Sequence, residues 1–296
     1  MQLLIFILIF PFLWIVSILP HRLFYGVSNV VFFFVYRVFG YRKEIVLNNL
    51  KLTFPDKSDR EHKEIRLKFY KHLCDTFMEM VKTMNMSKAD VKKRYQVVNI
   101  DLLRALEKEK SVLIVCSHYA NWEWNVSINN YITSKGYAVY QKIGNKYFDQ
   151  WIKKVRSRWN TTPILQKDTV KTVLYNERNH IRSAYGMVSD QSPPYSRAQY
   201  WSNFMGLTVP VFNGAEVLAK KLDLSVVFLK VTKEKRGYYK AELIPITPSG
   251  KNTEKNEITN QFLKLTETQI REQPAYYLWT HRRWKHAGKK PKHNKN

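Results

Sequence analysis

The chain has 296 residues, of which 45% are hydrophobic and 14% aromatic, so it can bury a substantial core and is not a disordered polypeptide. Its 49 Lys and Arg residues against 24 Asp and Glu give a formal net charge of +25. That excess indicates a polyanionic partner, such as nucleic acid, an anionic membrane, a phosphorylated substrate or an acidic protein. Two isolated cysteines exclude a disulfide framework, and the scattered histidines predict no structural metal.

The N-terminal segment, residues 1–20, is almost entirely apolar and has no charged side chain. About 20 helical residues at 1.5 Å each span roughly 30 Å, the thickness of one hydrocarbon layer. A cleaved signal peptide would have basic residues before the apolar run and small residues after it, and this segment has neither. We therefore expect an uncleaved transmembrane anchor in which Pro11 is tolerated as a kink.

A second apolar stretch, Leu23–Tyr36, is shorter and is interrupted by small and polar residues, which predicts an interfacial or packing helix. The nearby basic residues all follow the anchor, so the positive-inside rule places the body of the protein in the cytoplasm. Further helices are expected at Arg42–Lys51 and Ser58–Asn85. The second of these begins with a capping box formed by Ser58 and Glu61.

After this interfacial and helical segment, residues 21–95, β-rich runs alternate with amphipathic stretches. This rhythm is typical of an α/β fold with a mixed, mostly parallel sheet and helices on both faces. We assign that catalytic domain to residues 96–284 and a basic tail to residues 285–296. Strands are predicted at Ser111–Cys116, Tyr137–Gln141, Thr162–Leu165, Ser183–Ser189, Ser225–Lys233 and Tyr238–Ile246. Helices are predicted from about Asn121 and at Lys146–Trp159, Thr169–Asn179, Asn213–Lys221 and Lys255–Glu272, with a long loop at Ser189–Val209.

The stretch His118–Glu123 carries the strongest chemical signal, because it follows a buried strand and ligands bind at the carboxyl ends of strands in open α/β sheets. On one helix these two side chains would point about 140° apart, so they can meet only if His118 lies in the turn and Asn121 caps the next helix. Glu123 could then hold one imidazole nitrogen and leave the other as a base. The alternative is a structural strand end, in which the helix dipole favours Glu123.

Cys116 offers a different chemistry, since a cysteine two residues before His118 shares a face of the strand and could act as a thiolate nucleophile. The simpler interpretation is a small buried apolar side chain.

The form H-x-x-N-W-E at residues 118–123 resembles the His-x4-Asp/Glu signature of glycerolipid acyltransferases. It resembles more closely the late acyltransferases of lipid A biosynthesis, the lauroyl/myristoyl transferase family. The resemblance extends over nearly the whole chain, through segments in the same order at Val46–Asp56, Tyr185–Gln191, Phe204–Val227 and Tyr277–Lys285. Departures from the family pattern, such as Cys116-Ser117 and Asn160 in place of glycine, bear on chain-length or acceptor preference rather than on the chemistry.

The resemblance implies transfer of a fatty acyl group from an acyl carrier protein thioester to a hydroxyl of a lipid A precursor, with no metal or diffusible cofactor. His118 would be the general base and Glu123 would orient it. Arg156 or Arg158 would stabilise the oxyanion or bind an acceptor phosphate.

The other residues implied by the resemblance surround this pair. Asn121, Asp190 and Gln191 would shape the pocket, while Arg282 and Arg283 would contact the membrane surface or phosphates. The expected partners are acyl carrier protein, the anionic membrane surface and a phosphorylated glycolipid acceptor, which together account for the basic charge without nucleic acid. The resemblance also implies a single-pass protein of the inner membrane with its catalytic domain on the cytoplasmic side.

Two other functions stay open at this point. A related acyltransferase that acts on a lysophospholipid or an amino-acid lipid would share the same motif pair. A membrane-tethered nucleic-acid-binding protein would explain the charge and the aromatic content, although no RNA- or DNA-binding signature is present.

Overall fold

A mixed sheet forms the centre of the structure, a computed structural model that describes residues 1–289. Its seven strands have the order β1-β9-β8-β2-β5-β3-β4, and neighbouring strands are parallel except for the antiparallel pair β8–β9. This confirms the predicted mixed, mostly parallel sheet. The strands are β1 (Tyr95–Val97), β2 (Val112–Cys116), β3 (Lys135–Tyr140), β4 (Thr161–Leu165), β5 (Ser183–Val188), β8 (Ser225–Lys235) and β9 (Tyr238–Thr247).

Strand β2 lies between β5 and β8, and all five of its residues are buried. Its sequence VLIVC is a continuous apolar run rich in β-branched residues, as expected for a parallel strand covered on both faces. The central position of β2 brings the turn that follows it, with His118, to the middle of the sheet edge.

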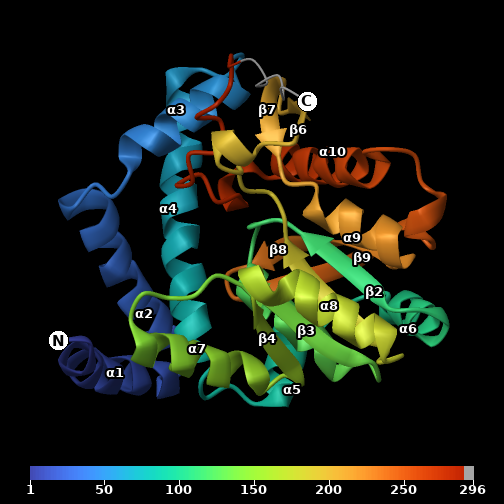
Figure 1. Cartoon of the computed structure of the whole chain (residues 1–296). Coiled ribbons are helices and arrows are strands. Elements are labelled where there is room, and N and C mark those ends of the chain that lie inside the picture. Colours follow the sequence, from blue (N-terminus) through green and yellow to red (C-terminus); the bar gives the residue numbers. More distant parts are fainter. Residues whose placement is uncertain (290–296) are drawn as a thin grey trace.

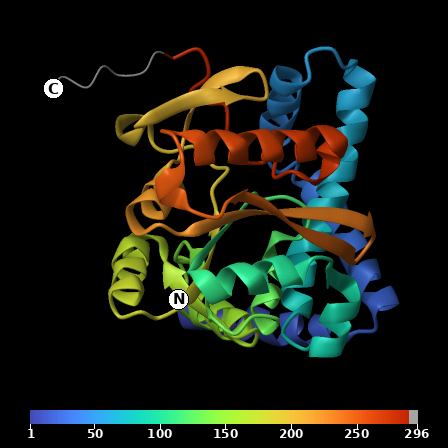
Figure 2. The same cartoon turned by 90° about the vertical axis from the view of Figure 1, so that its right-hand side faces the viewer.

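Helices cover both faces of the sheet, as predicted. Parallel strands connect through right-handed crossovers, so the direction of each connection fixes the face on which its helix lies. This places α6 (Ile100–Glu109), the 3₁₀ helix η2 (Trp122–Asn130) and α7 (Lys146–Ser157) on one face, and α8 (Thr169–Arg178) and α9 (Gly214–Leu222) on the other. The last long helix, α10 (Glu257–Glu272), contacts α9, and Figure 2 shows it across the sheet from α6.

A layer of N-terminal helices stands beside the sheet (Figure 1). It contains α1 (Gln2–Ile18), α2 (His21–Phe32), the π-helix η1 (Phe33–Val38), α3 (Lys43–Thr53) and α4 (Asp59–Lys82), whereas α5 (Lys88–Arg94) contacts β1 and β9 of the sheet. The long helix α4 separates α2 from the sheet and contacts η2. Its predicted capping box is confirmed: the Ser58 amide donates to Glu61 Oε2 at 2.8 Å, and the Glu61 amide donates to Ser58 Oγ at 3.3 Å.

The apolar N-terminal segment forms a 17-residue helix that packs along α7. The Phe6 ring lies edge-on to Phe148 with centroids 5.1 Å apart, and Phe10 lies edge-on to Trp151 at 6.2 Å. Within residues 1–289, no single helix is long and apolar enough to cross a membrane, whereas a pair bent by 85°, His21–Val38 with Lys43–Thr53, meets the length and composition together. The structure does not confirm the expected transmembrane anchor.

Other boundaries agree with the predictions to within a few residues, with three differences. The expected loop at Ser189–Val209 contains a hairpin of β6 (Tyr200–Phe204) and β7 (Leu207–Val211), whose turn residues Met205 and Gly206 both have positive φ. Helices α5 and α6 and strand β1 were not predicted, and the segment after Asn121 is a 3₁₀ helix. The part of the predicted basic tail at 290–296 lies outside the described residues.

Candidate active site

The parallel register of β2 and β5 brings a histidine and an aspartate together. Cys116 lies opposite Val188 in the register, and His118 and Asp190 each follow two residues later. His118 Nδ1 is 2.7 Å from Asp190 Oδ1. The Asp190 side chain is only 2% exposed, whereas that of His118 is 20% exposed, so the imidazole is the accessible member of the pair.

Asp190, and not Glu123, is therefore the carboxylate that holds the imidazole, which corrects the geometry predicted for the pair His118–Glu123. Glu123 instead binds Arg156, whose Nη2 lies 2.8 Å from Oε2 and 3.0 Å from Oε1. The reason is local: Glu123 belongs to η2, and that helix directs it toward α7, which carries Arg156. Glu123 still affects His118 through its charge, which raises the pKa of the imidazole.

The pKa values of the pair follow from this arrangement. Burial lowers the pKa of His118, but the charge of Asp190 and its hydrogen bond outweigh burial and leave that pKa above its usual value of 6.5. Burial raises the pKa of Asp190, and the charge and hydrogen bond of His118 bring it below its usual value of 3.8. The two groups thus stabilise each other as an imidazolium and a carboxylate.

The turn that carries His118 is fixed by the C-terminal segment of the chain. Tyr119 forms a β-bridge with Tyr277, and the Leu278 amide donates to the His118 carbonyl at 3.0 Å. The Ala120 amide donates to the Tyr276 carbonyl at 2.9 Å. Ala120 itself has φ of 48°, a strained conformation for a residue with a Cβ, which persists only where surrounding contacts enforce it.

A segment from the N-terminal layer secures the same assembly. Asn49 Nδ2 donates to the carbonyls of Trp279 and His281, both at 2.8 Å. Four of the segments that resemble the acyltransferase family therefore meet here, at Asn49, His118, Asp190 and Trp279. Their separation along the sequence hides the fact that they build one site.

An apolar cavity of about 80 Å³ lies between η2 and the sheet, and Cys116 and Trp122, on either side of His118 in the chain, both line it. Its wall is made of residues from four strands, β2, β3, β5 and β8, and from η2, and Glu123 and Arg156 also line it. The lining residues include Ile114, Cys116, Val126, Ile128, Tyr137, Ala138, Val139, Gly186, Val188 and Leu229. The amides of Asn125 and Asn129 also line the cavity, and most of the remaining wall is apolar. A mostly apolar pocket with a few polar groups suits a hydrocarbon chain with one polar end.

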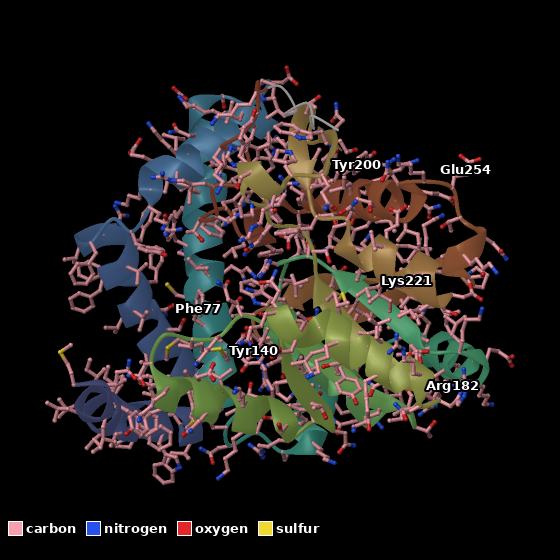
Figure 3. The ribbon with its side chains drawn as sticks, viewed as in Figure 1. Phe77, Tyr140, Arg182, Tyr200, Lys221 and Glu254 are labelled. Carbon is pink, nitrogen blue, oxygen red and sulfur yellow. The ribbon has the colours of Figure 1, made fainter. Side chains whose placement is uncertain are left out.

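Two aromatic side chains flank Trp122 and Arg156, and Figure 3 labels both of them. Phe77 of α4 is half exposed and lies edge-on to Trp122 with ring centroids 6.4 Å apart. Trp122 in turn lies 5.5 Å from the His118 ring. Tyr140, at the end of β3, lies 5.8 Å from the Arg156 guanidinium carbon.

The structure places the remaining predicted residues in different environments. Asn121 is fully buried and caps η2, since its Oδ1 accepts from the Trp124 amide at 3.1 Å, so the predicted cap is confirmed. Gln191 Nε2 lies 3.5 Å from His118 Nε2, close to the base but long for a hydrogen bond. Arg282 is exposed, as a membrane or phosphate contact requires.

Arg158 and Arg283 have structural partners instead of the predicted ligands. The Arg158 guanidinium donates to the carbonyls of Thr83, at 2.9 Å, and of Met84 and Met86 beyond the C-terminus of α4. Arg283 is 1% exposed and donates to the Pro210 carbonyl at 3.0 Å, with its guanidinium 5.1 Å from the Phe204 ring. Burial removes Arg283 from any membrane surface, which corrects that prediction.

The thiolate alternative for Cys116 does not fit its surroundings. The side chain is buried, and burial raises the pKa of the thiol to about 12. A neutral thiol is a poor nucleophile, so Cys116 acts as a small apolar residue in the cavity wall.

The pairing of Asp190 with His118 and the polar side chains of α4 beneath the turn were not predicted from the sequence. The polar side chains of α4 could have been found from their spacing, because His72, Thr76 and Glu79 recur at helical intervals among the apolar residues of its buried face. Polar residues on a buried helical face must have partners, so their spacing pointed to a polar element packed against α4.

Fold and site together define an α/β protein with a histidine–carboxylate pair at the end of parallel strands and an apolar cavity beside it, an arrangement suited to proton transfer on a substrate with a hydrocarbon chain. The family model for bacterial lipid A biosynthesis acyltransferase matches residues 1–286, and the chain belongs to that family. This confirms the resemblance found in the sequence and establishes the protein as an acyltransferase family member.

Two curated relatives agree with the assignment. The chain is 24% identical over 257 residues to the lipid A biosynthesis palmitoleoyltransferase of Escherichia coli (strain K12), a match that covers 82% of this chain and 79% of that protein. The same values hold for the lipid A biosynthesis acyltransferase of Shigella flexneri.

Proposed function

We propose that this protein transfers a fatty acyl group from an acyl carrier protein thioester to a hydroxyl of a lipid A precursor, with His118 as the general base. The observation that carries the proposal is the 2.7 Å contact of His118 Nδ1 with buried Asp190, next to an apolar cavity. Membership of the lipid A acyltransferase family favours this reaction over nucleic-acid binding.

The contact with Asp190 determines which imidazole nitrogen does the chemistry. Nδ1 donates its proton to the carboxylate, so Nε2 is the nitrogen with a free lone pair. Nε2 takes the proton of the attacking hydroxyl, and Asp190 stabilises the imidazolium that forms. When the tetrahedral intermediate collapses, the C–S bond breaks and the same proton passes to the carrier thiolate.

Arg156 is the candidate for oxyanion stabilisation. It lines the cavity, and the thioester carbonyl would lie near it when the acyl chain fills the apolar part. Its salt bridge to Glu123 fixes one edge of the guanidinium and leaves further N–H groups for the developing negative charge. Glu123 thus orients Arg156 and adds negative charge near His118.

Exposed basic residues on the segment that carries Arg156 support an acidic acyl donor. Lys142, Lys146 and Lys154 are exposed on α7 and the loop before it, the same segment that carries Arg156. A carrier protein with an acidic face would be steered to such a surface, and the attraction would weaken with salt.

The exposed apolar side chains of the N-terminal layer support membrane attachment. Leu8 of α1 is 69% exposed and Phe39, just after η1, is 75% exposed. Leu4, Phe12, Ile15, Leu23, Val30, Phe33 and Phe34 are also exposed on α1, α2 and η1, which lie on the outer side of α4 in Figure 1. With exposed Arg22 and Arg37 near them, these side chains fit the cytoplasmic face of an inner membrane, where the acceptor lipid would be found.

The test is a purified-enzyme assay in which acyl carrier protein carrying acyl chains of different lengths is offered together with a lipid A precursor. The product should gain one acyl ester, and His118→Ala should abolish it while the circular dichroism spectrum is unchanged. Parallel reactions with lysophospholipid and with amino-acid lipid acceptors test the alternative substrates. Transfer to one of these acceptors with none to the lipid A precursor would overturn the proposed acceptor.

A further inference from the structure

A row of polar side chains runs along the buried face of α4 and ends just beyond it. His72, Thr76, Glu79 and Thr83 recur at intervals of three or four residues, and each is at most 5% exposed. Residues at this spacing share one face of a helix. We call these four residues the α4 polar row.

Every member of the α4 polar row contacts the turn that follows His118. His72 Nε2 lies 3.2 Å from the strained Ala120 carbonyl, and Thr76 Oγ1 reaches the same carbonyl at 3.5 Å. Glu79 Oε2 accepts from Asn121 Nδ2 at 2.7 Å. Thr83 Oγ1 accepts from the Trp124 indole at 2.9 Å.

Glu79 is the centre of this arrangement because it joins three separate elements. Besides Asn121, it accepts from the hydroxyl of Tyr25 on α2, at 2.8 Å, and from that of Tyr239 on β9, at 2.7 Å. All three donors are neutral. Burial raises the pKa of Glu79 to about 7, although the positive charge of Lys233 lowers it. The three hydrogen bonds that Glu79 accepts are the geometric link between the three elements.

Asn121 links Glu79 to the chemistry. Its Nδ2 is held by Glu79, and its Oδ1 caps η2 at the Trp124 amide. The next two residues of η2 are Trp122, which packs on His118, and Glu123, which holds Arg156. A shift of Asn121 would therefore move both the ring beside the base and the carboxylate beside the arginine.

We propose that Glu79 and the α4 polar row are positioning residues that hold the turn 120–124 in the geometry required for acyl transfer, an inference that rests on the proposed function. Their contacts are with Ala120, Asn121 and Trp124, so they act on the site through these three residues. Displacements of about 1 Å in such a frame can cost roughly 100-fold in rate.

Two variants at one position separate positioning from charge. Glu79→Met has a similar size but cannot accept a hydrogen bond, and it leaves the Asn121 amide buried without a partner. In Glu79→Gln the amide oxygen can accept from Asn121 and Tyr239, and its NH₂ can donate to the Tyr25 hydroxyl. We expect kcat to fall about 10- to 100-fold in Glu79→Met with KM for the acyl donor nearly unchanged, and to stay within a few-fold of wild type in Glu79→Gln.

Two further variants keep the test decisive if Glu79→Met fails to fold. Thr83→Val is nearly isosteric and removes the acceptor of the Trp124 indole, so kcat should fall about tenfold. The matched control, Tyr239→Phe, removes a 2.7 Å bond to the same Glu79 oxygen but keeps the ring, which lies edge-on to Trp124 with centroids 5.7 Å apart. Its kcat per folded molecule should stay close to wild type.

The outcomes distinguish a failure of the positioning role of Glu79 from a failure of the proposed acyl-transfer function. If Glu79→Met and Thr83→Val keep wild-type kcat, or if Glu79→Gln is as inactive as Glu79→Met, positioning through hydrogen bonds is wrong. If the wild-type enzyme itself transfers no acyl group to the lipid A precursor, the proposed function fails instead. The same kcat and KM comparison is then made with the acceptor that the assay identifies.

Discussion

The substitution Asp190→Asn tests the central contact of the proposed mechanism. It keeps the shape of a side chain that is 2% exposed, but it removes the negative charge 2.7 Å from His118 Nδ1. An asparagine can also present its NH₂ group to Nδ1, which favours the tautomer with its proton on Nε2. In that tautomer the nitrogen that should act as the base is already protonated.

The expected loss follows from the role assigned to the pair. General base catalysis is typically worth about 10²–10⁴-fold, which corresponds to roughly 2.7–5.4 kcal/mol of transition-state stabilisation. We expect kcat/KM of Asp190→Asn to fall within that range. The cavity and the Glu123–Arg156 pair do not contact the substituted atom, so binding of the acyl donor should change much less.

The pH profile of kcat/KM gives a sharper measurement than the rate alone. His118 must be neutral to accept a proton, so activity rises with pH through its pKa, which Asp190 holds above the usual value of 6.5. Without Asp190, the burial that lowers this pKa is opposed only by the weaker effect of Glu123. The acidic limb of the variant should therefore move to lower pH while its plateau falls.

If the plateau falls but the acidic limb stays at the wild-type pH, Asp190 is not the group that raises the pKa of the His118 imidazole. Unchanged kcat/KM would refute the role of the pair altogether. The profile is measured with purified enzyme, one acyl-carrier donor and one acceptor, and Asp190→Ala reports whether the shape of the side chain adds to the effect of its charge.

The contact between His118 and Asp190 should also make the stability of the folded protein depend on pH. Because the pKa of His118 is raised in the folded state, its contribution to stability is fully present below pH 6.5. That contribution is lost as the pH rises through the pKa of the folded state. The lowered pKa of Asp190 contributes above 3.8 and is lost as pH falls through its folded value. The difference in melting temperature between wild type and Asp190→Asn should thus be largest between these two ordinary pKa values.

Three further predictions concern the cavity, the thiol and the apolar surface. Ala138→Leu adds a larger side chain to the cavity wall, so competition between donors should shift toward shorter acyl chains; an unchanged preference would place the chain elsewhere. Cys116→Ser should keep most of the activity, because the buried thiol has a pKa of about 12; loss of transfer in a folded variant would restore the thiolate mechanism. Leu8→Glu with Phe12→Glu should reduce flotation with anionic vesicles at equal thermal stability, and full retention would assign membrane binding to another surface.

Most of the longer helices and strands could be predicted from the sequence because local patterns specify them. The run VLIVC identifies a buried strand, and the capping box at Ser58 identifies the start of α4. The turn residues Met205 and Gly206 show the limit of this approach. Their hairpin lies in a segment with no strong alternation of apolar and polar residues, so its sequence predicts only a loop.

The partner of His118 could not be predicted from the sequence because it depends on strand order. His118 and Asp190 meet only because β5 lies next to β2 in the sheet, with Cys116 opposite Val188. Glu123 was predicted as the carboxylate partner of His118 because it is only five residues away in the chain, and the sequence does not show which distant residues lie close in space. Arg283 shows the same limit, since a basic residue next to other basic residues gave no sign that it would be buried against a carbonyl and an aromatic ring.

The contacts of Asn49 with Trp279 and His281 have a consequence for the biogenesis of the enzyme. Asn49 and Trp279 are 230 residues apart, and the turn bearing His118 is bridged to the same C-terminal segment. During synthesis the strands of the sheet can begin to pair before that segment leaves the ribosome, but the reactive turn cannot be locked. The nascent acyltransferase should therefore stay inactive until translation is almost finished, and truncation before Tyr276 should yield a chain that lacks activity even where it folds.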